Sequence, residues 1–112
     1  LSTITITLIV AVVVAGSKSS LASAGLIVLL AVILHNAIGL VLGYGAARLT
    51  GLSPAQRRAL SIEVGMQNSG LAASLAAAYF SPLAALPAAV FSVWHNVSGA
   101  VIAALFARAK AD

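Results

Sequence analysis

Residues 53–71 read Ser-Pro-Ala-Gln-Arg-Arg-Ala-Leu-Ser-Ile-Glu-Val-Gly-Met-Gln-Asn-Ser-Gly-Leu, a capped helix start followed by a polar run. Ser53 is followed by a proline, and Gln56 stands three residues after the serine, which is the pattern of a capped helix start. A polar run framed by Gly65 and Gly70 then interrupts the apolar segment. Unwound backbone is tolerated inside a membrane only where it is buried in protein or lines a cavity. The stretch therefore predicts a broken helix.

The composition predicts that a lipid bilayer surrounds the chain. Hydrophobic residues make up 62% of the 112 residues and charged residues only 7%, whereas a soluble domain carries about 25% charged residues. The net charge of +4 does not indicate nucleic acid as a partner, because the six cations form no extended basic face and no aromatic stacking platform accompanies them. The absence of cysteine from the sequence excludes disulfides, thiol catalysis and thiolate metal sites.

Four apolar segments are separated by short polar stretches, and each is predicted to be a transmembrane helix. They are residues 1–16, 21–49, 53–80 and 82–110. The first is rich in β-branched residues and by itself could be a strand, but its length and its neighbours favour a helix. Because the chain opens inside an apolar run without methionine, we expect the native protein to begin upstream; a cleaved signal peptide is less favoured, since a charged leading region is missing. The predicted fold class is all-α, a polytopic membrane protein.

Short signals predict where these helices end and how they pack. Residues 16–20 and 50–52 are predicted turns, and Ser81-Pro82 repeats the serine-proline helix start. Gly39 and Gly43 stand at the GxxxG spacing, which lets a neighbouring helix approach closely.

The cations predict the orientation in the membrane. With four alternating spans, one side carries five of the six cations, namely Arg48, Arg57, Arg58, Arg108 and Lys110, and the other side carries Lys18. Cytoplasmic loops are enriched in Lys and Arg. The loop at 48–58 and the C-terminus are therefore predicted to be cytoplasmic, in a plasma (inner) membrane.

Glu63 is the residue that points most directly to function. It lies about eight residues, or ~12 Å, beyond the capped helix start, nearly halfway through a hydrocarbon core of ~30 Å. A carboxylate at that depth costs several kcal/mol unless it is paired, protonated or solvated, so it marks a functional site by default. Two readings stay open beside ion binding: a pairing of Glu63 with a cation of another helix, and a proton relay.

The residues after Glu63 favour a metal cation over a proton. Gln67 and Asn68 do not titrate, and with Gln67 four residues after Glu63 we expect both side chains on one helix face. A carboxylate, amide oxygens and freed carbonyls are hard ligands, and one negative charge suits a monovalent ion. The helix that resumes after Ser69 would direct its positive end toward an anionic substrate.

A second polar cluster, Trp94-His95-Asn96, falls near the middle of the last segment, with Ser92 and Ser98 around it. His95 either lines a cavity at the depth of Glu63 or is a neutral core histidine bonded to a neighbour. Trp94 is equally compatible with a cavity wall and with packing. For the earlier pair His35-Asn36 we predict hydrogen bonding between helices near the GxxxG face.

Enzyme patterns do not occur in the sequence. It contains neither HExxH nor GxSxG, and neither a phosphate-binding glycine loop nor an intramembrane aspartate that could orient a Ser-His pair. We therefore predict that the protein is not an enzyme.

The motifs resemble those of the bile acid:sodium symporter family, particularly its bacterial members. The resemblance covers the chain from about His35 to its end, and it rests on Ser61-Ile-Glu-Val-Gly-Met-Gln-Asn-Ser-Gly-Leu71, Phe80-Ser-Pro-Leu-Ala-Ala-Leu-Pro87 and Phe91-Ser-Val-Trp-His-Asn96. It implies a transporter of about ten helices in two inverted repeats, of which this chain resembles the last four. Residues 1–16 would belong to a panel domain, and 21–49, 53–80 and 82–110 to a core domain in which 53–80 is the broken crossover helix.

The resemblance also implies roles for individual residues. Glu63 would be shared between two sodium sites, Val64 and Met66 would offer backbone carbonyls to sodium, and Gln67 its side chain. Residues implied to face the substrate cavity are Asn68, His95 and Asn96.

The expected function is sodium-coupled symport of an organic anion, such as a bile acid or a small carboxylate like pantoate or pyruvate, by alternating access. The expected partners are that small anion, Na⁺ as the coupled ion, the lipid bilayer and a preceding N-terminal repeat of the same protein, with no nucleic acid. The alternatives are a structural or proton-coupled membrane subunit in which Glu63 pairs helices or relays protons, and a channel, although the rings and repeats typical of pores are missing.

Overall fold

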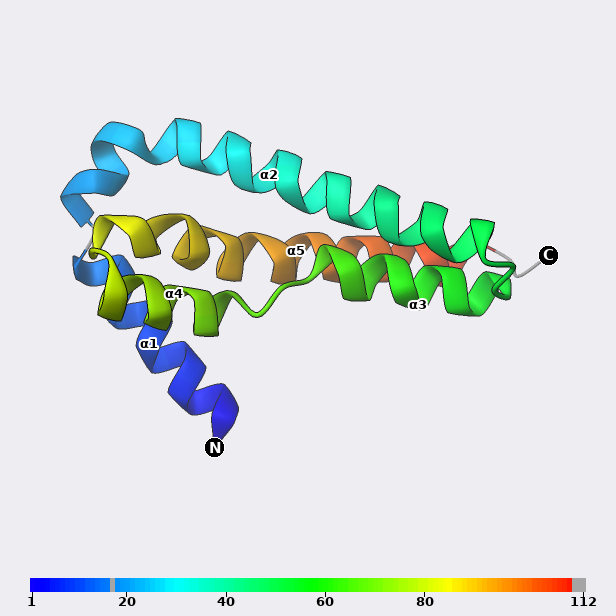
Figure 1. Cartoon of the computed structure of the whole chain (residues 1–112), viewed down its shortest axis with the longest axis horizontal. Coiled ribbons are helices and arrows are strands. Elements are labelled where there is room, and N and C mark those ends of the chain that lie inside the picture. Colours follow the sequence, from blue (N-terminus) through cyan, green and yellow to red (C-terminus); the bar gives the residue numbers. More distant parts are fainter. Residues whose placement is uncertain (17, 110–112) are drawn as a thin grey trace. The chain divides into compact units, whose positions relative to one another are not determined.

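The computed structural model describes residues 1–16 and 18–109, and within them the regular structure is helical (Figure 1). The helices are α1 (Ser2–Gly16), α2 (Lys18–Leu49), α3 (Pro54–Gly65), α4 (Ser69–Tyr79), the short 3-10 helix η1 (Leu83–Ala85) and α5 (Leu86–Arg108). The predicted all-α class is confirmed, and the β-branched first segment is a helix.

Two predicted boundaries differ from the structure. The predicted turn at 16–20 is wrong at its end, because α2 already begins at Lys18. Polar Lys and Ser predict exposure, but neither residue prevents a helix as proline does. The last segment begins with η1 before α5 starts at Leu86, and the hydroxyl of Ser81 accepts a hydrogen bond from the Ala84 N–H at 3.1 Å. Lys110, where the last predicted segment ends, lies outside the described residues.

The chain divides into two compact units. The first comprises residues 1–33 and 68–94, and in it α1 packs against α4 and α4 against η1. The second comprises residues 34–67 and the described part of 95–112. It contains the second half of α2, all of α3 and the second half of α5, and therefore most of the predicted site residues.

A tight turn joins α2 to α3 in the second unit. Gly51 has a φ of +75°, a conformation that glycine adopts without strain, and its N–H donates to the Arg48 carbonyl at 3.2 Å. Ser53 then caps α3: its hydroxyl accepts from the Gln56 N–H at 3.4 Å, while the Gln56 side-chain oxygen accepts from the Ser53 N–H at 3.0 Å. The predicted capping box is confirmed. Both ends of the turn are therefore set by residues within it.

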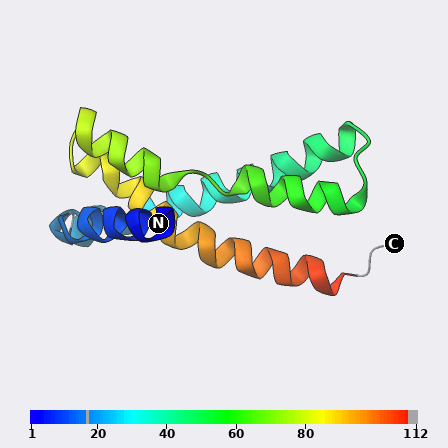
Figure 2. The ribbon, with the colours of Figure 1, turned by 90° about the horizontal axis from the view of Figure 1, so that it is seen from below.

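The two glycines of the GxxxG pattern form the surface on which α3 packs. A Cβ added to Gly39 would lie 3.0 Å from the Val64 carbonyl oxygen, and one added to Gly43 would lie 2.8 Å from the Leu60 carbonyl oxygen. The second half of α2 and α3, which belong to the same unit, run side by side in both ribbon views (Figures 1 and 2). The prediction of a close helix neighbour is confirmed, and the neighbour is the next helix of the same chain.

Arg58 of α3 binds backbone carbonyls at the C-terminal end of α5. Its guanidinium donates to the carbonyls of Phe106 at 3.1 Å and Ala109 at 3.3 Å, and it lies 5.8 Å from the centre of the Phe106 ring. Tyr44 of α2 stacks on the same ring with 6.3 Å between the ring centres. The α2–α3 turn and the end of α5 therefore lie together, as the alternation of spans predicts.

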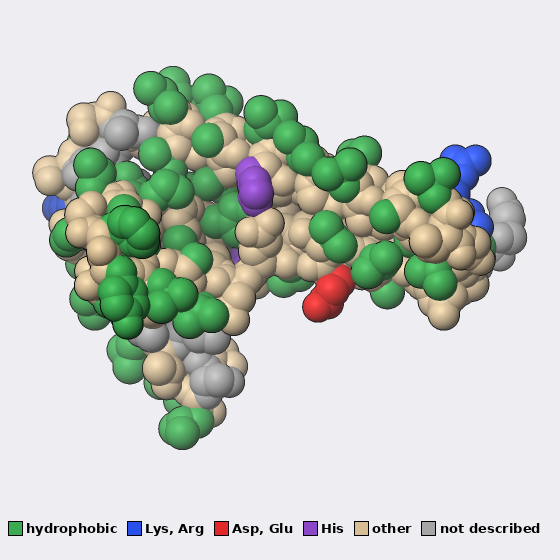
Figure 3. All heavy atoms as spheres, viewed as in Figure 1, with side chains coloured by type: hydrophobic (Ala, Val, Ile, Leu, Met, Phe, Trp, Pro, Cys, Tyr) green, Lys and Arg blue, Asp and Glu red, His purple; other side chains and the backbone are tan. Residues whose placement is uncertain are grey.

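Two stretches, Gly25–Leu49 and Leu83–Arg108, are long and apolar enough to cross a membrane. Large apolar side chains are exposed along α2, among them Leu26, Ile27, Val41 and Leu42, each more than 60% exposed (Figure 3). α1, α3 and α4, with 15, 12 and 11 residues, are each shorter than the ~20 residues of a spanning helix. Four spans stay a prediction, in which α3 and α4 together make one.

Candidate functional site

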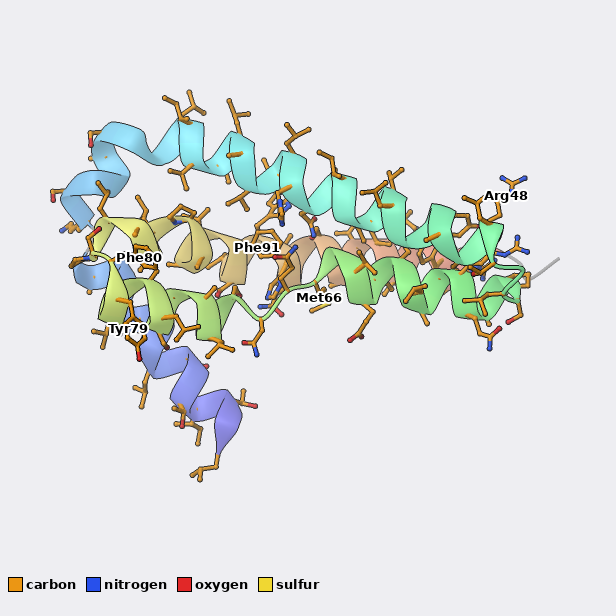
Figure 4. The ribbon with its side chains drawn as sticks, in the orientation of Figure 1. Arg48, Met66, Tyr79, Phe80 and Phe91 are labelled. Atoms are coloured by element: carbon orange, nitrogen blue, oxygen red, sulfur yellow. The ribbon has the colours of Figure 1, made fainter. Side chains whose placement is uncertain are left out.

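The helix break lies at Met66–Asn68, between α3 and α4. α3 ends at Gly65, and Met66 has extended backbone angles of −87° and 132° while its N–H still donates to the Ile62 carbonyl at 2.8 Å. Figure 4 shows Met66 where the ribbon leaves α3. The interruption predicted from the glycines and the polar run is therefore confirmed.

The break separates Gln67 from the helix that carries Glu63. In a continuous helix the Gln67 N–H would donate to the Glu63 carbonyl; here it donates to Nδ1 of His95 on α5, at 3.4 Å. The expectation that Gln67 shares a helix face with Glu63 is wrong, because α3 ends two residues before Gln67. An i, i+4 relation requires helical backbone over the whole interval.

Helix α2 holds the chain on both sides of Met66. The buried Asn36 side-chain amide donates to the Gly65 carbonyl at 2.9 Å, and Nε2 of His35 lies 2.6 Å from the side-chain nitrogen of Gln67. The prediction that the His35-Asn36 pair makes hydrogen bonds near the GxxxG face is confirmed. These bonds converge on the break, which was not predicted; in the sequence, the nearby glycines Gly39 and Gly43 were the one signal for it.

Met66 is also held from α5. A Cβ added to Gly99 would lie 3.2 Å from the Met66 sulfur, so this side chain packs directly on the α5 backbone. Since α2 contacts Gly65 and Gln67, the unwound backbone around Met66 is placed between two helices of the same unit. Met66 nevertheless keeps 37% of its surface exposed.

Glu63 and Val64 stand at the end of α3 in different surroundings. Glu63 is exposed, and among the described residues it makes neither a hydrogen bond nor an ion pair. Among the described residues, no group of three or more His, Cys, Asp or Glu gathers to hold a metal ion. The carbonyl oxygen of Val64 lies against Gly39 of α2, while the Val64 side chain is 40% exposed.

Asn68 begins α4 and belongs to the first unit. Its side-chain oxygen accepts a hydrogen bond from the Leu71 N–H at 3.1 Å, so Asn68 is the N-cap of that helix. Because the cap occupies the oxygen, the side chain has mainly its amide hydrogens to offer to a ligand. The following residue, Ser69, is buried and accepts a hydrogen bond from Ser92 at 2.6 Å.

His95 and Asn96 lie on α5 in the same unit as Gln67. His95 is 8% exposed, and since its Nδ1 accepts the Gln67 N–H, the proton of the neutral ring belongs on Nε2. Asn96 is exposed. The structure therefore places His95 in contact with Gln67 in the break. The other ring nitrogen of His95, Nε2, carries the proton and is a hydrogen-bond donor.

The predicted ion-binding and substrate-binding residues are thus distributed unevenly. Those in the second unit are Glu63, Val64, Met66, Gln67, His95 and Asn96, and of these Gln67 and His95 are in direct contact. Asn68 is the one predicted site residue in the first unit.

The chain is similar to sodium-dependent transporters over almost its whole length. It is 50% identical over 107 residues, 96% of the chain, to the uncharacterized sodium-dependent transporter YocS of Bacillus subtilis (strain 168). It is 42% identical over 94 residues to the probable chloroplastic sodium/metabolite cotransporter BASS1 of Oryza sativa subsp. japonica, and 42% identical over 93 residues to the Arabidopsis thaliana protein of that name. No family model matches the chain.

The chain spans only part of each relative. It covers 33% of the Bacillus protein and 23% of each plant protein. These relatives are named as transporters and not as enzymes. Together with the two apolar helices, they indicate a membrane protein.

Proposed function

We propose that this chain is part of a sodium-coupled symporter for organic anions, a member of the bile acid:sodium symporter family. The observation that carries the proposal is the helix break at Met66–Asn68, directly after Glu63, in a chain similar to sodium-dependent transporters. Discontinuous helices form the ion and substrate sites of many secondary transporters, because a helix end supplies polar backbone at membrane depth.

The end of α3 has the chemistry of a cation site. The last carbonyls of a helix lack intrahelical donors and carry partial negative charge, and Glu63 adds a full charge on the last turn. Its exposed carboxylate forms no ion pair with a Lys or Arg among the described residues. In the proposal Glu63, the carbonyls of Val64 and Met66 and the side-chain oxygen of Gln67 bind sodium, and ligands from outside this chain complete the shell.

The residues proposed for the anion are hydrogen-bond donors. Asn68 retains amide hydrogens after capping α4, and His95 carries its proton on Nε2. The N-terminus of α4 adds partial positive charge next to Asn68 in the chain. Asn96 is exposed on α5 and supplies a further amide. A carboxylate-bearing substrate suits these donors.

The architecture proposed for the whole protein has about ten helices in two inverted repeats. In it α1 belongs to the panel, and α2, the broken pair α3–α4 and α5 belong to the core that moves against it. The membrane proposed for the protein is the plasma membrane. The proposed orientation has the C-terminus in the cytoplasm, because the α2–α3 turn and the end of α5 carry most of the cations.

The test is uptake by the full-length protein in proteoliposomes, with labelled taurocholate, pantoate and pyruvate and an inward sodium gradient. Glu63→Gln keeps the shape of the side chain but removes the charge, so we expect sodium-driven uptake to fall at least tenfold while the folded protein is retained. Ala59→Gln, on an exposed position of α3, is the control and keeps uptake.

Three results would overturn the proposal. Uptake that follows a proton gradient without sodium would establish a proton-coupled carrier. Loss of the folded protein in Glu63→Gln would indicate a glutamate that pairs helices. Undiminished sodium-driven uptake in that variant would remove Glu63 from the ion site.

A further inference from the structure

Gln67 is held by two histidines from two different helices. Its backbone N–H donates to Nδ1 of His95 on α5, and its side-chain nitrogen lies 2.6 Å from Nε2 of His35 on α2. Both contacts use nitrogen atoms of Gln67, which carry only hydrogens to donate. The atoms of Gln67 that remain able to bind a cation are its oxygens, and oxygen is the ligand atom that an alkali cation requires.

In the contact with His35, the nitrogen end of the Gln67 amide faces Nε2 of the ring. An amide nitrogen can only donate, so His35 must accept with an unprotonated Nε2, as the neutral ring with its proton on Nδ1. In this arrangement the side-chain oxygen of Gln67 points away from His35. With the amide reversed, the same ring atom would face the oxygen lone pairs and repel them, unless the proton moved to Nε2.

The stretch of α2 next to this contact is itself bound to α3. Asn36, the neighbour of His35, donates to the Gly65 carbonyl at 2.9 Å and is 3% exposed. One and two turns further along α2, Gly39 and Gly43 meet the backbone of α3. The stretch of α2 that carries His35 is therefore anchored to the residues before the break, and His35 contacts Gln67 within the break.

We propose that His35 is a positioning residue for the sodium site: it accepts the Gln67 amide N–H and so turns the Gln67 side-chain oxygen toward the cation. The inference rests on the proposed function, since it takes Gln67 as a sodium ligand. His35 itself does not touch the ion. It acts by keeping Gln67 from rotating its amide nitrogen into the site.

The experiment measures sodium binding apart from transport, as the thermal stabilisation of the purified full-length protein by NaCl relative to KCl. His35→Ala removes the acceptor, and we expect the half-saturating sodium concentration to rise roughly 3- to 10-fold, the value of one hydrogen bond. In His35→Gln the side-chain oxygen takes the place of Nε2, so this variant restores most of the affinity. Leu42→Ala, at an exposed position of α2, is the control and leaves sodium binding unchanged.

A double-mutant cycle separates positioning from a general structural role. If His35 acts through Gln67, His35→Ala has no further effect on sodium binding once Gln67 is alanine. An equal shift in both backgrounds, or an unshifted His35→Ala, would overturn the inference. If His35→Ala does not fold, the comparison of His35→Gln with His35→Asn, whose oxygen is one methylene too short, decides the same question.

The failure of this inference differs from a failure of the proposed function. Wild-type protein that shows no stabilisation by sodium contradicts sodium coupling itself. A sodium-dependent wild type with additive His35 and Gln67 effects contradicts only the positioning role.

Discussion

Gly43 and Gly45 stand two residues apart on α2, and a methyl group at each should have opposite effects on stability. At Gly43 an added Cβ would lie 2.8 Å from both the Leu60 carbonyl oxygen and the Val64 Cβ, and 3.1 Å from the Ser61 Cα. These are backbone or backbone-proximal atoms that cannot rotate away. At Gly45 an added Cβ meets nothing within 4 Å.

The expected magnitudes follow from two terms. Replacing a helical glycine by alanine gains about 1 kcal/mol in helix propensity, and overpacking costs about 1–3 kcal/mol. Gly45→Ala should therefore stabilise the protein by up to about 1 kcal/mol. Gly43→Ala should come out about 0–2 kcal/mol less stable than wild type, which leaves about 1–3 kcal/mol between the two variants.

The assay is reversible denaturation of the purified full-length protein in detergent, or its melting temperature where unfolding is irreversible. Gly43→Val should be less stable than Gly43→Ala, because two more methyl groups enter the same contact. If Gly43→Ala proved as stable as Gly45→Ala, the close packing of α3 on α2 would be wrong, and the bonds of His35 and Asn36 to the break would lose their basis.

Three further predictions address the helix ends and the substrate residues. Ser53→Ala removes the N-cap of α3 and should lower the free energy of unfolding by about 1 kcal/mol, measured in the same denaturation assay, with no change in substrate affinity. Asn68→Asp keeps a capping oxygen for α4 but removes the amide hydrogens and adds a negative charge. The free energy of unfolding should therefore stay as in wild type, while substrate affinity at saturating sodium falls at least tenfold. Unchanged substrate affinity would exclude Asn68 from the substrate site. Asn96→Ala should weaken substrate binding at saturating sodium by roughly 10- to 100-fold, whereas sodium binding without substrate should stay as in wild type; a loss of sodium binding equal to that of Gln67→Ala would contradict the division between the two sets.

The features that sequence analysis predicted correctly depend on residues close together in the chain. The capping box joins Ser53 to Gln56, three residues apart, and the break follows from glycines and polar side chains within one short run. Even the α2–α3 packing had a local signal, since Gly39 and Gly43 leave room for a neighbour whatever that neighbour is.

The surroundings of Gln67 could not be predicted in the same way. His35 is 32 residues from Gln67 and His95 is 28, so both contacts exist only once α2, α3 and α5 have packed. The i, i+4 rule placed Gln67 beside Glu63, and it failed because a helix rule says nothing about residues beyond the helix end. The early start of α2 at Lys18 was missed for a related reason, since polarity reports exposure and not backbone conformation.

Composition and local pattern were enough to predict that this chain lies in a membrane, that it is helical, and that one helix is broken close to its glutamate. These are consequences of composition and of interactions within a few residues. The packing of the helices was needed to show that Glu63 is exposed and without a partner among the described residues, and that both nitrogens of Gln67 contact histidines. Such contacts depend on which helix faces meet, and residues close together in the sequence carry no signal for that.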